Sequence, residues 1–144
     1  MSDLPINQDS VGQDPDGEKL SVLAAMERWV EAIMTTDPRT VAELYAEDAV
    51  LWGTVSPLLR TTREAIQDYF EHFMKLEKLN VAYSNPQVRV LGDVAVNSGN
   101  YTFFHEADGA VRSIPARYSF VYRRAPSGEW KIIDHHSSRV PREP

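Results

Sequence analysis

The feature that most constrains the fold is a run of four alternating apolar and polar segments in the second half of the chain. In the 144-residue sequence these segments cover about residues 81–91, 94–105, 111–124 and 129–138. They are separated by turn-forming residues, namely Gly92-Asp93, Ala107-Asp108-Gly109 and Ala125-Pro126-Ser127-Gly128. Period-two alternation is typical of half-buried strands, and consecutive strands joined by tight turns form an antiparallel meander. The sequence therefore predicts a four-stranded antiparallel sheet.

The first half of the chain carries helical patterns instead. A stripe of apolar residues spaced three and four apart predicts a long helix over about residues 18–35, and its members are Leu23, Met26, Val30 and Ile33. Asp37 as N-cap and Pro38 as first helical residue predict a second, short helix. Thr61 and Glu64 have the spacing of a capping box, which predicts the start of a third helix.

Residues 49–54 predict one further strand between the second and third helices. Helix, helix, strand, helix and then four meandering strands is an α+β order. A strongly curved sheet wrapped on the long N-terminal helix, with two further helices, encloses a cone that is packed on one face and open at one end. We expect this cone over residues 18–141, preceded by a flexible acidic arm at residues 1–17.

Composition narrows the class of function. The formal net charge of -6 and the pI near 5.2 argue against nucleic-acid binding, which needs a basic surface. No apolar run is long enough to span a membrane, and the polar N-terminus does not resemble a signal peptide. The absence of cysteine excludes thiolate zinc sites and fits a reducing compartment, so we expect a cytoplasmic protein.

Three segments resemble one known family. They are Asn85-Pro86 with the Gly92-Asp93 turn, the late Arg112, and the block from Gly128-Glu129-Trp130 through His135-His136-Ser137-Ser138 to Pro141. These segments resemble the association domain of calcium/calmodulin-dependent protein kinase II and its stand-alone bacterial relatives. That family belongs to the nuclear transport factor 2-like (NTF2-like, SnoaL-like) superfamily of cystatin-like cones. The resemblance covers about residues 18–141 and implies the same α+β cone.

The resemblance also predicts which side chains point into the cone. In the kinase variant three arginines line a deep pocket, and the resemblance places them at Tyr101, Ser119 and Ser137, none of which is basic. If these three point inward, strand alternation predicts that a second set points inward as well, namely Gly99, Phe103, Arg117, Val121, Ile133 and His135. Arg117 then lies two residues from Ser119, where it could restore a cation on the same face.

From these residues we predict a small-molecule site. Tyr101 and His135 form a candidate catalytic acid–base pair, and Arg117 is a candidate partner for a ligand carboxylate or a developing oxyanion. Ser119 and Ser137 are expected to bind the ligand as well. A structural hydrogen-bond network is the alternative for His135, and a core carboxylate or carbonyl is the alternative partner for Arg117.

Aromatic residues of the first half complete the predicted cavity. Trp52 is expected to line the ligand site. Tyr69, Phe70 and Phe73 of the third helix belong to the core, or in part to the wall of an apolar cavity. No metal site is expected, because His135 and His136 are adjacent on a strand and leave it on opposite faces.

The opposite face of the sheet is predicted to be a dimer surface, because the relatives pair through it. Five outward side chains are expected there, namely Tyr118, Phe120, Tyr122, Asp134 and His136. Two functions remain open. One is a pocket protein that binds a partly apolar acid or carbonyl compound, with or without cofactor-free lyase, isomerase or hydrolase activity. The other is a non-catalytic oligomerisation module, a homodimer or a larger homo-oligomer. Neither requires a cofactor.

Overall fold

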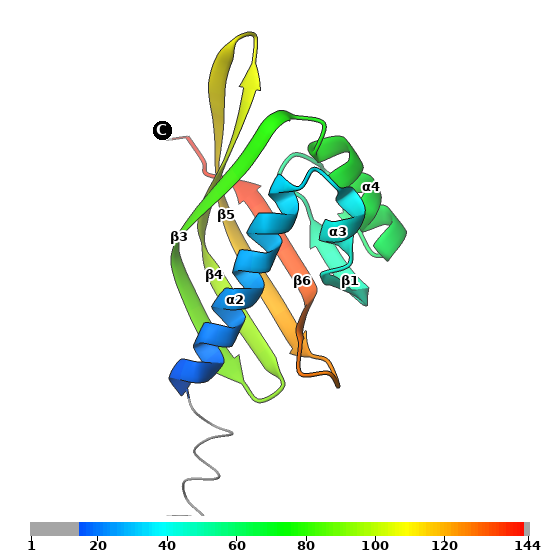
Figure 1. Cartoon of the computed structure of the whole chain (residues 1–144), viewed down its shortest axis with the longest axis vertical. Coiled ribbons are helices and arrows are strands. Elements are labelled where there is room, and N and C mark those ends of the chain that lie inside the picture. The colour runs from blue at the N-terminus through cyan, green and yellow to red at the C-terminus, as the bar shows by residue number, and fades with distance from the viewer. Residues whose placement is uncertain (1–14, 143–144) are drawn as a thin grey trace, which may run out of the picture.

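The computed structural model describes residues 15–142 as three helices and six strands (Figure 1). The helices are α2 (Pro15–Met34), α3 (Pro38–Ala42) and α4 (Arg63–Phe73). The strands are β1 (Tyr45–Trp52), β2 (Leu59–Arg60), β3 (Glu77–Leu91), β4 (Val94–Ala107), β5 (Ala110–Arg124) and β6 (Trp130–Arg139). The predicted order of elements is confirmed, with the short strand β2 as an addition.

The six strands form one curved sheet in the order β2-β1-β6-β5-β4-β3. Strands β3 to β6 pair with their sequence neighbours in antiparallel fashion, which confirms the predicted meander. Strand β1 joins β6 in parallel, so that Trp52 lies beside His136. Helix α2 crosses one face of the sheet, and α3 and α4 lie beside β1 (Figure 1). The fold is therefore the expected α+β cone.

Two of the helix starts follow the local sequence closely. Asp37 caps α3, and its carboxylate accepts a hydrogen bond from the Arg39 amide at 3.1 Å. The start of α4 lies one residue later than predicted, because Thr62 rather than Thr61 accepts the hydrogen bond from the Ala65 amide. Both caps satisfy amides that the first turn of a helix leaves without an intrahelical partner.

The predicted N-terminal arm lies mainly outside the described residues, which begin at residue 15. The last three of its 17 positions are part of α2, because that helix begins at Pro15 rather than at Glu18. Asp16 and Glu18 lie in its first turn, where carboxylates interact favourably with the helix dipole. In the described part of the chain, no helix is long and apolar enough to cross a membrane.

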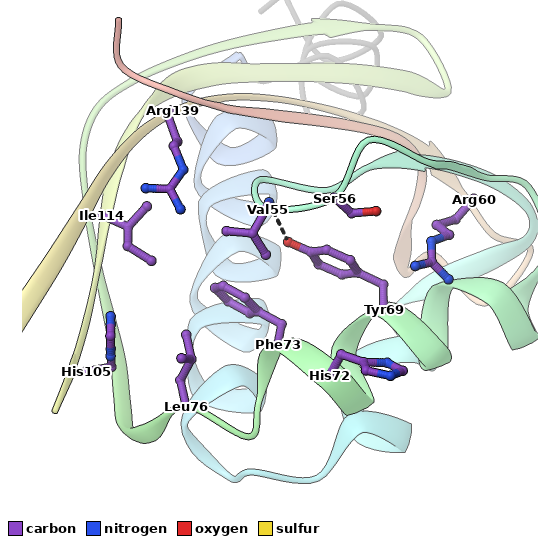
Figure 2. A pocket seen from close by; sticks show the side chains of 10 residues that line it. All are labelled: Val55, Ser56, Arg60, Tyr69, His72, Phe73, Leu76, His105, Ile114 and Arg139. Atoms are coloured by element: carbon purple, nitrogen blue, oxygen red, sulfur yellow. Dashed lines mark hydrogen bonds between the residues drawn. The ribbon is translucent and has the colours of Figure 1, made fainter. Parts of the chain in front are cut away.

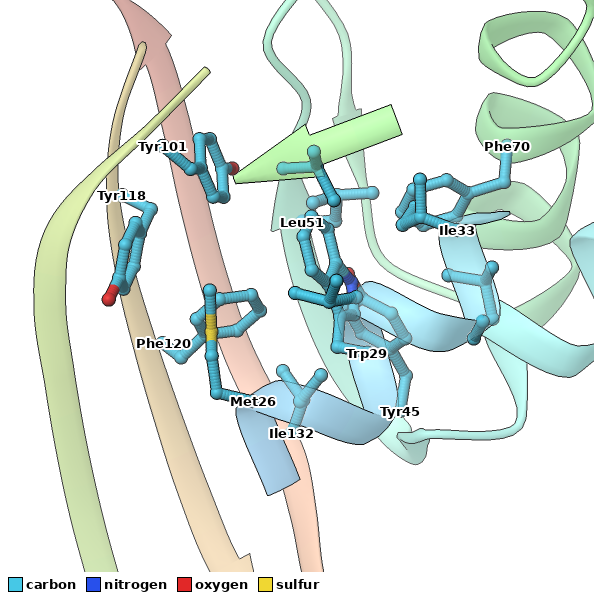
Figure 3. Packing of buried hydrophobic residues seen from close by; sticks show 14 of the residues in the cluster. Met26, Trp29, Ile33, Tyr45, Leu51, Phe70, Tyr101, Tyr118, Phe120 and Ile132 are labelled. Carbon is cyan, nitrogen blue, oxygen red and sulfur yellow. The ribbon is translucent and has the colours of Figure 1, made fainter. Parts of the chain in front are cut away.

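The core lies between α2 and the concave face of the sheet. Trp29 is 1% exposed, stacks on Tyr101 with ring centroids 5.5 Å apart, and meets Phe120 edge-on at 5.3 Å (Figure 3). The aromatics of β5, namely Tyr118, Phe120 and Tyr122, all belong to this core. The prediction that they face outward onto a partner was wrong. Burying three large rings against α2 outweighs any arrangement that leaves them in water.

A bulge in β6 changes which side chains face inward along that strand. Val121 pairs with Asp134, whereas the next residue of β5, Tyr122, pairs with Ile132. Ile133 is therefore an extra residue with no partner in the register. Ile132 is buried and Ile133 only half-buried, so the prediction that Ile133 faces the cone was wrong. His135, on the far side of the bulge, does face inward.

Candidate functional site

A buried polar cluster surrounds His135. Its Nδ1 lies 2.7 Å from the Tyr45 hydroxyl, and its Nε2 lies 3.0 Å from the Tyr101 hydroxyl. The indole Nε1 of Trp29 donates to the Tyr45 oxygen at 3.2 Å. The predicted contact between Tyr101 and His135 is therefore present, inside the core rather than on the wall of a cavity.

Burial holds this cluster in its neutral state. It lowers the pKa of His135 to about 3, and repulsion from His136 acts in the same direction with a smaller effect. The ring of Phe120 stacks on the imidazole at 3.9 Å and excludes water on that side. Burial likewise raises the pKa values of Tyr45 and Tyr101 well above the usual tyrosine range. None of these three groups changes its charge near neutral pH.

Hydroxyl groups extend the cluster towards the open end of the cone. The Tyr101 hydroxyl interacts with the side chains of Ser137 and Thr54, which are 2.5 Å apart at their oxygens. Thr54 in turn interacts with the hydroxyl of Tyr69, and that oxygen also accepts a hydrogen bond from the Val55 amide at 3.4 Å. A continuous series of polar contacts therefore runs from the centre of the core to Tyr69.

Tyr69 lines a cavity of about 410 Å³ at the open end of the cone (Figure 2). Helix α4 contributes Tyr69 and Phe73, and the loop after β1 contributes Val55 and Ser56. The complete lining is Val55, Ser56, Arg60, Tyr69, His72, Phe73, Leu76, His105, Ile114 and Arg139. Five of these ten side chains are aliphatic or aromatic, so the cavity has an apolar wall and a polar rim.

The two arginines of the rim differ in their partners. Arg60 donates to the Asp68 carboxylate at 2.8 Å, and this contact lowers the pKa of Asp68. Arg139 is exposed, and no ion pair is found for it within residues 15–142. His105 lies across the cavity from α4, and its Nδ1 is buried without a hydrogen-bond partner among the described residues (Figure 2). Among the described residues, the cavity therefore has one arginine without an ion pair, Arg139, and two buried nitrogens without a hydrogen-bond partner, His105 Nδ1 and Arg60 Nε.

The structure separates the predicted site residues into two groups. Tyr101, His135 and Ser137 are buried on the concave face, as predicted. Arg117, Ser119 and Trp52 lie on the opposite face, so the prediction that they point into the cone was wrong. For Arg117, Ser119 and the half-buried Val121, the reason is the register of β5. With Tyr118 and Phe120 buried against α2, the alternate residues of that strand must face away from it.

The three outward residues form their own surface contacts. Arg117 donates from two guanidinium nitrogens to the Ser138 hydroxyl at 3.2 and 3.3 Å. The Ser119 and Ser98 hydroxyls are 3.0 Å apart, and the rings of Trp52 and His136 are 6.4 Å apart. Arg117, Ser119, His136 and Ser138 border an open depression of about 300 Å³. Whether any of the predicted residues binds a ligand stays a prediction.

Sequence reasoning missed His105 and Arg139 as cavity residues, whereas Tyr69 and Phe73 were expected in the core or at a cavity. The signal that could have identified them is their position near the ends of predicted strands. His105 lies near the end of β4 and Arg139 at the end of β6, and in this sheet both strand ends reach the open end of the cone. No cluster of three or more potential metal ligands is found among residues 15–142.

Comparison with known proteins gives a consistent picture. Residues 18–141 match the family model described as the calcium/calmodulin dependent protein kinase II association domain. A candidate member of that family from Xanthomonas campestris is 42% identical with a TM-score of 0.79, covering 85% of this chain and 87% of its own. No curated protein matches the sequence.

Two more distant structures share the fold alone. An NTF2-like protein with a cystatin-like fold from Novosphingobium aromaticivorans is 19% identical with a TM-score of 0.80, covering 99% of this chain and 94% of its own. A ketosteroid isomerase-like protein from Erwinia carotovora atroseptica is 19% identical with a TM-score of 0.71, covering 87% of this chain and 98% of its own.

Proposed function

This chain belongs to the calcium/calmodulin dependent protein kinase II association domain family, and we propose that it binds a small, partly apolar acid or carbonyl compound at the open end of its cone. The observation that carries the proposal is the combination of an apolar wall with the unpaired Arg139 in one cavity. A volume of about 410 Å³ falls in the usual range for small-molecule sites.

The chemistry of the lining favours an acidic ligand over a basic one. Arg139 offers a planar guanidinium that suits a carboxylate, and Arg60 contributes less because Asp68 already neutralises it. No acidic residue is among the ten that line the cavity. Phe73, Leu76 and Ile114 supply an apolar surface for the hydrocarbon part of the ligand.

A catalytic role for His135 and Tyr101 stays a prediction. Both side chains are buried, and neither lines the cavity. They can influence a ligand there only through the hydroxyls of Ser137, Thr54 and Tyr69. We therefore propose ligand binding alone. A cofactor-free lyase, isomerase or hydrolase activity would be a further property of the same site.

Phenylacetate is a suitable probe, because it joins one carboxylate to one apolar ring. We expect saturable binding in a calorimetric titration, and loss of binding in Leu76→Trp, which fills the cavity. Arg139→Gln should weaken binding about five-fold, the scale of a solvent-accessible ion pair. The matched control is Arg117→Gln, an exposed arginine on the other face of the sheet, which should bind as the wild type does. Equal affinity in the wild type and Leu76→Trp would contradict the proposal.

Assembly into a homodimer or larger homo-oligomer is the second candidate function. It is supported by the family match and by Trp52, which is 40% exposed on the face of the sheet opposite α2. A large aromatic side chain exposed beside polar neighbours is typical of a surface that another protein covers. The predicted Asp134 and His136 lie on this face, whereas the predicted aromatics of β5 do not.

Size-exclusion chromatography with light scattering tests this second function. We expect an oligomer at micromolar concentration and a shift towards monomer in Trp52→Arg. The matched control is Val111→Arg, an exposed apolar residue on the β4–β5 hairpin, which should leave the mass unchanged. A wild-type monomer at micromolar concentration would rule assembly out and leave the pocket proposal untouched.

A further inference from the structure

The hydroxyl of Tyr69 joins the cavity to the buried polar cluster. The side chain is 4% exposed, lines the cavity, and accepts a hydrogen bond from the Val55 amide at 3.4 Å. Its ring lies directly against the backbone of Gly53, where any Cβ would overlap it. Glycine at this position therefore holds the Tyr69 hydroxyl at the junction between the core and the cavity.

The first hydrogen bond of the cluster has only one possible direction. An indole N–H donates and cannot accept, so Trp29 must donate to the Tyr45 oxygen at 3.2 Å. The remaining neighbour of that hydroxyl is Nδ1 of His135 at 2.7 Å. Tyr45 therefore uses its own proton to donate to Nδ1, which must then be the unprotonated nitrogen of the ring.

The protonation of the imidazole fixes the direction of the next hydrogen bond. His135 is buried among Trp29, Phe120 and two tyrosines and is neutral, so its single ring proton is on Nε2. Nε2 then donates to the Tyr101 oxygen at 3.0 Å. In the opposite direction, Nδ1 would donate to Tyr45, whose own proton would have no acceptor recorded among the described residues. A buried hydroxyl without an acceptor is unfavourable, so the direction from Trp29 outward is preferred.

The last steps are carried by hydroxyl groups. Having accepted from His135, Tyr101 has its own proton free for the neighbouring hydroxyls of Ser137 and Thr54, a pair in which either oxygen can be the donor. Thr54 neighbours the Tyr69 oxygen, which also accepts from the Val55 amide. Because the Tyr69 oxygen already accepts from the Val55 amide, its proton is available to an acceptor in the cavity.

We propose that Tyr69 donates a hydrogen bond to an acceptor oxygen of the bound ligand, and that the series of polar contacts from Trp29 through His135 favours it as a donor. Tyr69 is then the residue that selects carbonyl and carboxylate oxygens over ammonium groups deep in the cavity. Trp29 and His135 are positioning residues that never touch the ligand. This inference rests on the proposed function, which the rim arginine and the apolar wall support independently.

Nitrogen-15 NMR of ring-labelled histidine tests the direction without any ligand. We expect the His135 signals to show a protonated Nε2 and an unprotonated Nδ1 at neutral pH. In Tyr45→Phe, which removes the donor to Nδ1, the Nδ1–H tautomer should gain population. His136, exposed on the other face, is the internal control and should not respond. A wild-type His135 with its proton on Nδ1 would contradict the proposed direction of the hydrogen bonds from Trp29 through His135.

Carbonyl carbon-13 NMR of labelled phenylacetone tests the contact with the ligand. The carbonyl signal of the bound probe should move downfield in the wild type and lose that shift in Tyr69→Phe. Phenylacetate affinity should fall about ten-fold in the same variant, the scale of one hydrogen bond to a charged group. The control is Tyr83→Phe, whose hydroxyl bonds to Glu27 away from the cavity.

The outcomes separate the two proposals. An unchanged carbonyl signal and affinity in Tyr69→Phe, with phenylacetate still bound, would overturn the Tyr69 contact and leave the proposed function standing. If neither probe binds the wild type, the proposed function and the Tyr69 contact fail together. The His135 tautomer still decides the direction of the hydrogen bonds from Trp29 through His135.

Discussion

The two faces of the sheet are built from the same strands and differ in almost every physical property. On the concave face, Trp29 of α2 covers Tyr101, Phe120 and His135, and the His135 ring nitrogens there bond to the hydroxyls of Tyr45 and Tyr101. On the opposite face, Arg117 and its neighbours lie at the surface, where they contact solvent and the hydroxyl groups of serine side chains. Residues adjacent in sequence therefore belong to different environments.

The comparison teaches that residue type alone does not identify a site. His135 and His136 are neighbours, yet burial lowers the pKa of the first to about 3, whereas the second is exposed. Ser137 joins the internal series of hydrogen bonds, whereas Ser138 receives Arg117 at the surface. Matched substitutions across the two faces measure this difference directly.

The largest difference in the free energy of unfolding is expected between variants of two tryptophans. Trp29→Ala removes the centre of the core and should reduce the free energy of unfolding by about 3–5 kcal/mol. Trp52→Ala, on the exposed face, should change it by about 0.5 kcal/mol or less in the monomer. Urea unfolding followed by circular dichroism measures both, and similar losses in the two variants would contradict the assignment of faces.

The second difference concerns the two histidines and pH. Because the pKa of His135 is about 3 in the folded protein and the ordinary value is about 6.5, the unfolded chain binds the proton first on acidification. Stability should therefore be complete above pH 6.5 and fall between pH 6.5 and 3, by up to about 1.4 kcal/mol per pH unit. His135→Gln should flatten this slope.

The exposed histidine is the control for that experiment. His136→Gln should reduce the slope only slightly, because it removes the smaller of the two causes that lower the pKa of His135. Carboxylates with lowered pKa, such as Asp48 and Asp68, also weaken the fold in acid, at lower pH than the histidine. A slope that persists fully in His135→Gln would show that another group is responsible.

The smallest difference in the free energy of unfolding is expected between variants of two serines. Ser137→Ala removes a hydroxyl from the buried series and should reduce the free energy of unfolding by about 1 kcal/mol. Ser138→Ala removes a solvent-accessible partner of Arg117 and should change it by a few tenths of a kcal/mol. Thermal unfolding of the pair at neutral pH checks the order, and a larger loss for Ser138→Ala would reverse the comparison.

The helices, the meander and the contact between Tyr101 and His135 could all be predicted from the sequence. Helical spacing in α2 and alternation in β3 to β6 are local signals that survive folding, since each element buries its own apolar stripe. Asp37 as a cap is equally local, because the carboxylate bonds to an amide only two residues away. The resemblance supplied the family, which the family match and the 42% identical relative confirm.

The facing of β5 was predicted wrongly because one inward position was assigned to Ser119. A shift of one residue in a strand moves every side chain to the other face, so Arg117, Tyr118 and Phe120 were all misplaced together. The strand's own pattern, with aromatics at alternate positions, pointed to the arrangement that the structure has. Trp52 was misplaced in a similar way, because its facing depends on the parallel pairing of β1 with β6.

The sequence by itself determined the elements, their order and the cone, because hydrophobic period and turn chemistry are properties of short segments. Only the tertiary structure decided the facing of β5, the bulge at Ile133, and the cavity that brings His105 and Arg139 opposite Tyr69. Those features depend on which strands lie side by side and on how aromatic rings pack against α2. Such contacts join residues far apart in the chain, and no local pattern records them.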